Sequence, residues 1–357
     1  MIRLPLFAAA LVLLSACEAL ESPTPIARGD AEEIVVATDS ATWAGPVGEA
    51  IRETVGRRIA TLPSNQGAFK FRRVPLTGQT LSTLQMTPAV MVVGDIDSPG
   101  DLGDFIRSRV GEGNLASVRA GDAAAVNVRE NLWAQNQLVT IATAADDRAL
   151  ALRLLDAGDG LRDRYDALAR LRTAEDMFGR LRQEDVEADL LDRHGFTLGV
   201  QADYVLVQDT TATAAGRTGT FVRFRRVLSD TWRDFFVFVE EGVSEVPPPA
   251  EVDAITDDLL RQFAQGSIDS SYVQIEKSRP QTNATAEIDG QAAQEQRGFW
   301  QTTLVPMGGS YVRYAWVDPA TDRLYLYYGM TFAPSRRLDK RKFLRQMETI
   351  AYSFRTE

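Results

Sequence analysis

The chain holds a single cysteine, Cys17, at the end of a short apolar N-terminal run. The tripeptide Leu14–Ala16 precedes it, which is the pattern of a bacterial lipoprotein signal that is cleaved before the cysteine. The thiol of Cys17 would then carry the lipid. An ordinary cleaved signal with an incidental cysteine is the alternative. The apolar run Leu6–Leu14 is too short to span a bilayer. We therefore expect a signal peptide over residues 1–16 and lipidation at Cys17.

The residues after the cysteine predict how the protein is held. Residues 17–31 are rich in Pro, Glu, Ser and Ala and lack apolar periodicity, which predicts a flexible tether. Each buried methylene contributes about 0.8 kcal/mol, so several acyl chains on Cys17 form a lasting anchor in membrane lipid. Glu18 follows the cysteine, and under the sorting rule of proteobacteria this favours the outer membrane. We expect a lipid-anchored protein of the cell envelope that faces the periplasm. The cell surface and the inner membrane stay open as alternatives.

Composition and motifs argue against several kinds of site. The formal net charge of −10 argues against a nucleic-acid partner. His194 is the single histidine, so histidine triads and His-rich zinc sites are hard to assemble. It precedes Gly195, which is the pattern of a helix C-terminus. Residues Asp95–Asp101 begin like a calcium loop, but Pro99 and Ile106 stand where two ligands are required. We expect no catalytic residues, no metal and no cofactor.

A basic run near the C-terminus stands out in this acidic chain. It contains Arg336, Arg337, Lys340 and Arg341. One interpretation is a patch that binds an anion such as a lipid phosphate, or an acidic partner. The other is a solvated face at the start of the last helix, with Asp339 as its N-cap.

Two tryptophans, Trp43 and Trp133, are candidates for a partner-facing pocket in the first half of the chain. Each lies beside a predicted element, Trp43 before a helix and Trp133 before a strand. Tryptophan buries a large area, so a buried structural anchor is the alternative for both.

Hydrophobic periodicity divides the chain into two domains. Residues 32–194 alternate strands and helices, which predicts an α/β domain. Its helical region starts at Asp146, and breaks are expected at Gly158–Gly160 and near Thr173. Residues 195–357 are rich in strands and predict an α+β domain with an antiparallel sheet. The strands expected in the first domain are 33–38, 69–74, 89–95 and 137–142. In the second they are 196–207, 220–227, 234–240, 299–304, 311–317 and 323–332, with helices at 251–264 and 340–353 and a polar loop at 276–296.

Three stretches carry a family resemblance. They are EIVVATDSATWAGPVGEAIRE near the start, NVRENLWAQNQLVTIAT in the middle and the segment from Tyr311 to Arg355. Together they resemble domain-of-unknown-function family 4837, lipoproteins of Bacteroidota and relatives. The resemblance runs from about Glu33 to the C-terminus and implies a Bacteroidota-type envelope. The C-terminal half is also similar to the Mog1/PsbP-like α/β/α sandwich, whose members are mostly binding or assembly modules. Fold alone does not determine function.

The expected function is therefore a non-enzymatic binding or assembly role in the envelope. Its expected partners are membrane lipid through Cys17 and an envelope protein. A carboxylate-based envelope hydrolase is the alternative, which would require convergent carboxylates in a cleft. A binding module would instead show an apolar groove or a charged patch.

Overall fold

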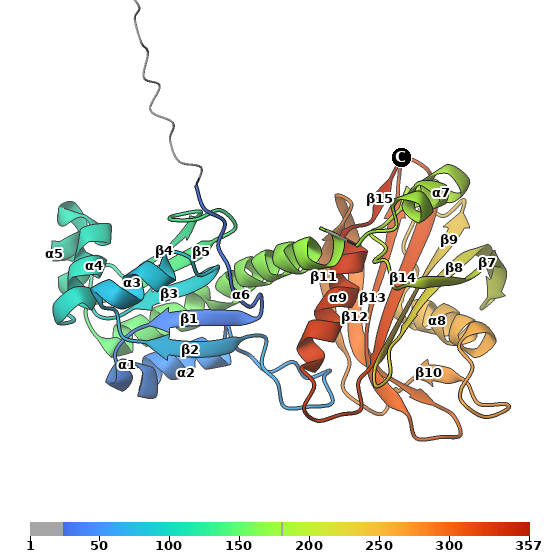
Figure 1. Ribbon diagram of the computed structural model, residues 1–357, viewed down its shortest axis with the longest axis horizontal. Helices are drawn as coiled ribbons and strands as arrows, with labels where there is room; N and C mark the ends of the chain where they lie inside the picture. Colours follow the sequence, from blue (N-terminus) through green and yellow to red (C-terminus); the bar gives the residue numbers. More distant parts are fainter. Residues whose placement is uncertain (1–23, 180) are drawn as a thin grey trace, which may run out of the picture.

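The computed structural model describes residues 24–179 and 181–357, so the predicted signal peptide and Cys17 lie outside the described residues. Figure 1 shows two domains, with α6 reaching from the first to α9 of the second. Within the described residues, no helix is both long enough and apolar enough to cross a membrane.

The first domain is a three-layer α/β fold. In residues 24–179, five strands form a sheet in the order β2-β1-β3-β5-β4, and β4 is the antiparallel strand. The central strands are buried on both faces, which is why they are nearly continuous apolar runs. Helices α1, α2 and α6 cover one face, and α3, α4 and α5 cover the other. The strands are β1 (Glu33–Ala37), β2 (Lys70–Val74), β3 (Ala89–Val93), β4 (Ala125–Glu130) and β5 (Leu138–Thr143); the helices are α1 (Ser40–Ala44), α2 (Pro46–Glu53), α3 (Gly78–Leu84), α4 (Gly100–Val110), α5 (Glu112–Arg119) and α6 (Asp147–Phe178).

The second domain is a sheet between two helices. In residues 181–357, an antiparallel sheet has the order β10-β12-β13-β14-β9-β8-β7, and β11 also pairs with β12. Helix α8 packs on one face and α9 on the other, and aromatic side chains fill both layers. The elements are α7 (Glu184–His194), β6 (Phe196–Thr197), β7 (Val205–Ala214), β8 (Arg217–Val227), β9 (Trp232–Glu241), α8 (Pro249–Phe263), β10 (Val273–Ile275), β11 (Thr282–Ile288), β12 (Gln291–Thr302), β13 (Gly308–Asp318), β14 (Arg323–Phe332), α9 (Lys340–Tyr352) and β15 (Arg355–Thr356).

The long helical region differs from its prediction. Helix α6 runs without a break through Gly158, Gly160 and Thr173. Gly158 permits close packing instead of ending the helix, because a Cβ there would lie 2.2 Å from the Cβ of Thr54, just after α2. The hydroxyl of Thr173 donates to the carbonyl of Ala169 in the preceding turn, which keeps it inside the helix.

Two further segments also differ. The predicted polar loop at 276–296 contains β11 and the first half of β12, which form a hairpin whose turn holds Asp289 and Gly290 at positive φ. Polar residues are expected there because much of β11 is exposed. The predicted domain boundary after His194 also changes. Helix α7 packs on the second domain, where Leu190 is buried in the core beside Phe196.

The two domains share an extensive contact. Leu62, from the loop between α2 and β2, is buried in the core of the second domain. The Ser310 hydroxyl donates to the Thr61 carbonyl at 2.6 Å, and an Arg341 guanidinium nitrogen donates to the Gly67 carbonyl at 2.9 Å. Backbone of the first domain is therefore bound directly by side chains of the second.

Candidate functional site

A cleft of about 620 Å³ lies between the two domains. One wall is the middle of α6, and the facing wall is β11. Residues 57–61 also line it, and α9 contributes Arg341, Arg345, Glu348 and Tyr352. These positions recur every three or four residues, so they form one stripe of α9 that faces the cleft. The site thus depends on elements from both halves of the chain.

The α9 side of the cleft is a buried network of charges. The Arg345 guanidinium donates to Glu32 at 2.7 Å and to Asp166 of α6 at 2.9 Å. Glu348, one turn further along, pairs with Arg297 of β12. Burial by itself raises the pKa of Glu348, but the charges of Arg297 and Arg345 outweigh it and hold the pKa below its usual 4.5. These ion pairs join strand, helix and N-terminal segment at one point.

Glu32 behaves differently from Glu348. It is 1 % exposed and does not line the cleft. Burial raises its pKa above the usual 4.5, because desolvation outweighs the attraction of Arg345 and Arg341. A catalytic proton donor or acceptor must reach its substrate, which a carboxylate buried away from the cleft does not do. Glu32 instead stabilises the contact between the two domains.

The outer walls of the cleft carry excess positive charge. Arg57 and Arg162 share Asp159, at 3.1 Å and 3.5 Å. Arg58 and Arg170 have no ion-pair partner among the described residues, and Arg170 lies over the Tyr352 ring at 4.3 Å. Seven arginines and four carboxylates line the cleft, so its lining favours an anion over a cation.

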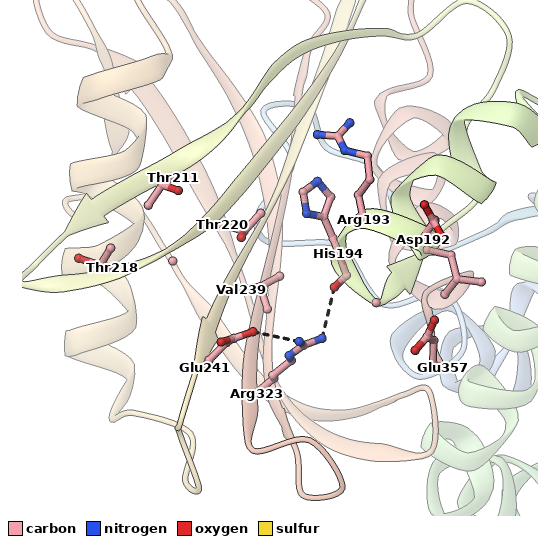
Figure 2. A pocket seen from close by; sticks show the side chains of 13 residues that line it. Asp192, Arg193, His194, Thr211, Thr218, Thr220, Val239, Glu241, Arg323 and Glu357 are labelled. Atoms are coloured by element: carbon pink, nitrogen blue, oxygen red, sulfur yellow. Dashed lines mark hydrogen bonds and ion pairs between the residues drawn. The ribbon is translucent and has the colours of Figure 1, made fainter.

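A second cavity of about 520 Å³ lies where α7 meets β8 and β9. Figure 2 shows His194 on one side and Thr211, Thr218 and Thr220 across from it. The His194 Nε2 lies 3.0 Å from Asp209. Among the described residues, no Ser or Thr hydroxyl bonds to this imidazole, so the pair lacks the nucleophile of a hydrolytic triad.

Arg323 organises the lower part of this second cavity. Its guanidinium lies between the Glu241 carboxylate, at 2.9 Å, and the His194 carbonyl, at 3.4 Å. Helix α7 ends at His194, and Gly195 follows with a φ of 71°. The prediction of a helix end at this histidine is confirmed. The charged side chains around it form ion pairs with one another.

Comparison with known families matches each domain to a separate family. Residues 183–353 match the model of the family DUF4837, a domain of unknown function. That match covers the second domain from α7 to α9. Residues 27–178 match a second family, DUF8532, also a domain of unknown function. A search of curated proteins found no match. The motif that begins at Glu33 and the motif over residues 127–143, both predicted to share the DUF4837 resemblance, therefore lie in the segment that matches DUF8532.

The predicted basic patch is divided by the fold of the second domain. Arg336 and Arg337 are exposed, but Lys340 and Arg341 are buried. The Lys340 ammonium donates to the Ser335 carbonyl at 2.7 Å, and Arg341 binds Gly67 across the domain contact. The four cations therefore do not share one surface. They do not form a solvated helix face either, because α9 lies against the first domain.

The two tryptophans lie on opposite faces of the first sheet. Trp43 packs on the α2 and α6 side, with its ring 5.9 Å from Phe71 and under the Arg52 guanidinium. Trp133 packs on the α4 side, 6.0 Å from the ring of Phe105. Both are half-buried, so they do not form one pocket.

Sequence reasoning missed the arginines of the cleft that lie outside α9. They come from the loop after α2, from α6 and from β12. The spacing of Arg162, Asp166 and Arg170 places them on one face of a helix, and this was the available signal. In residues 24–179 and 181–357, no group of three or more His, Cys, Asp and Glu side chains could hold a metal ion.

Proposed function

We propose that this protein is a lipid-anchored lipoprotein of a Bacteroidota-type cell envelope that binds an anionic partner without catalysing a reaction. The predicted lipidation of Cys17 supports the anchoring, and the tether that follows it would hold the two domains away from the membrane. The predicted Mog1/PsbP-like similarity of the second domain favours a binding role. The binding role rests on one observation, the arginine-rich cleft between the domains.

The chemistry of the cleft favours binding over hydrolysis. A glycan hydrolase needs one carboxyl group that keeps its proton and a second that is ionised. Glu348 binds Arg297, and the charges of Arg297 and Arg345 hold its pKa below the usual 4.5, so it is not the carboxyl group that keeps its proton. The guanidinium groups of Arg58 and Arg170 are available to a ligand, because no carboxylate among the described residues forms an ion pair with them. The alternative of a carboxylate-based envelope hydrolase therefore has less support.

Charge reversal in the cleft tests the binding role. We expect the purified protein to bind dextran sulfate, and Arg58→Glu combined with Arg170→Glu to weaken that binding about tenfold or more. Isothermal titration calorimetry measures the affinity. The matched control is Arg336→Glu with Arg337→Glu, which makes the same charge change on exposed residues outside the cleft. Equal weakening by both pairs would show that overall charge, and not the cleft, attracts the anion.

A further inference from the structure

One wall of the cleft is the free edge of a β-strand. In the described part of the chain, β11 pairs with β12 alone. Five successive residues, 282–286, line the cleft. Successive side chains of a strand point to opposite faces, so such a run shows that the edge itself borders the cleft. The backbone N–H and C=O groups on that edge have no partner strand and can template another.

The sequence of β11 leaves this edge open. Edge strands are commonly blocked by Pro, by Lys or by a bulge. Residues 282–288 read TNATAEI and contain neither Pro nor Lys, and their pairing with β12 is regular. Ala284 lies opposite Glu295 and Ala286 opposite Ala293. Their small side chains leave space on the cleft side of the sheet. Larger side chains at the same two positions would fill that space.

The opposite wall defines the charge of the occupant. Helix α6 lines the cleft with Arg162, Asp163, Asp166 and Arg170, and Arg58 lines it from the loop after α2. Arg345 binds Asp166, so one of the two α6 carboxylates is already paired. A strand added to β11 would direct alternate side chains toward these arginines. Acidic side chains at those positions would find cationic partners, and basic ones would be repelled.

We propose that the cleft binds an extended acidic polypeptide segment of an envelope partner, which adds to β11 as a further strand. Backbone hydrogen bonds to β11 supply affinity, and the α6 arginines select acidic side chains. This inference rests on the proposed anion-binding role of the cleft. It goes further, because an anionic polymer without a peptide backbone cannot extend the sheet.

The test uses the full-length lipidated protein in detergent micelles. The probe is a fluorescent octapeptide of alternating glutamate and valine, and anisotropy reports its binding. We expect it to bind about tenfold or more tightly than the same peptide with glutamine in place of glutamate. Arg58→Glu with Arg170→Glu should remove most of that difference, whereas Arg336→Glu with Arg337→Glu should leave it unchanged. Circular dichroism checks that each variant is folded.

Strand addition has its own readout on the unaltered protein. In an extended peptide only every second N–H points to the neighbouring strand. Two sets of N-methylated octapeptides, each methylated at alternate amides, should therefore differ in affinity by about tenfold or more. Equal affinity of the two sets would overturn strand addition.

The remaining outcomes separate this inference from the proposed function. Binding of dextran sulfate without binding of the acidic octapeptide overturns the peptide assignment and leaves the anion-binding role standing. Binding of neither probe overturns both. Self-association that Arg58→Glu and Arg170→Glu abolish, with no octapeptide bound, would assign the cleft to a second copy of the chain and overturn the peptide proposal.

Discussion

At the scale of single residues, position in the fold decides what each charge does. Arg345 is 4 % exposed and binds Glu32 and Asp166, so its charge holds segments together. Arg170, on α6, stacks on Tyr352 and has no ion-pair partner among the described residues. The two arginines line the same cleft, but only the second is available to a ligand. Residue type alone does not distinguish them.

Cys17 carries the residue-scale prediction about anchoring. Cys17→Ser should abolish incorporation of radiolabelled palmitate and release the protein from the membrane fraction, because serine cannot form the thioether. Labelling followed by membrane fractionation measures both. Ser15→Ala, which keeps a small residue before the cysteine, is the control and should remain labelled. Palmitate incorporation that persists in Cys17→Ser would contradict lipidation at this residue.

At the scale of elements, α6 and β11 show where sequence patterns mislead. Glycine is typical of breaks and turns, yet Gly158 lies inside a continuous helix where close packing requires the absence of a Cβ. The polar run of β11 has the composition of a loop, yet it pairs regularly with β12. In both cases tertiary structure explains the difference. Gly158 packs against Thr54, and β11 is polar because it lies at the edge of the sheet.

Two glycines in α6 form a matched pair for a stability test. Gly158→Ala should lower the free energy of unfolding by about 1–3 kcal/mol, because its Cβ would overlap Thr54. Gly160→Ala should raise that free energy by about 0.5–1 kcal/mol, because Gly160 is exposed, nothing lies within 4 Å of its added Cβ, and alanine favours helix. Urea denaturation measures both values. A stabilising effect of Gly158→Ala would contradict the close packing of α6 on α2.

At the scale of the whole molecule, ion pairs help hold the two domains in contact. Lys342 lies 3.1 Å from Asp30, and Lys70 lies 2.6 Å from Asp339. Burial raises the pKa values of Asp30 and Asp339, but hydrogen bonds and the nearby lysines outweigh it and hold them below the usual 3.8. Carboxyl groups with lowered pKa values stabilise the folded contact above their usual pKa and lose that contribution as the pH falls.

Acid should therefore weaken the domain contact. We expect the radius of gyration, measured by small-angle X-ray scattering, to stay constant from about pH 7 to pH 5 and to increase below about pH 4, as these carboxylates and Glu348 take up protons. Glu32 acts in the opposite direction, because its raised pKa favours the protonated form.

Removing the lysine partners provides the control for this acid effect. Lys70→Met with Lys342→Met should make the radius depend less on pH, since two of the ion pairs are then absent at every pH. A pH profile identical to that of the unaltered protein would show that these pairs do not hold the domains together.

The sequence by itself determined the features that depend on local pattern. Alternation of strands and helices predicted the α/β class of the first domain. Strands β3 and β5 are continuous apolar runs or nearly so, because they are buried on both faces of the sheet. Residues 311–317 and 323–332 predicted the central hairpin of β13 and β14. The apolar run before Cys17 predicted the signal peptide, which remains a prediction.

Only the tertiary structure decided the candidate site and the domain boundary. The cleft joins Arg58, Arg170 and Arg297, whose separation along the chain conceals their proximity. Helix α7 joins the second domain because Leu190 is buried in that core. The basic run at α9 is divided because Lys340 and Arg341 are buried, whereas Arg336 and Arg337 are exposed to solvent. Local pattern specifies which face of an element is apolar, but the long-range packing of those faces decides which charges remain for a ligand.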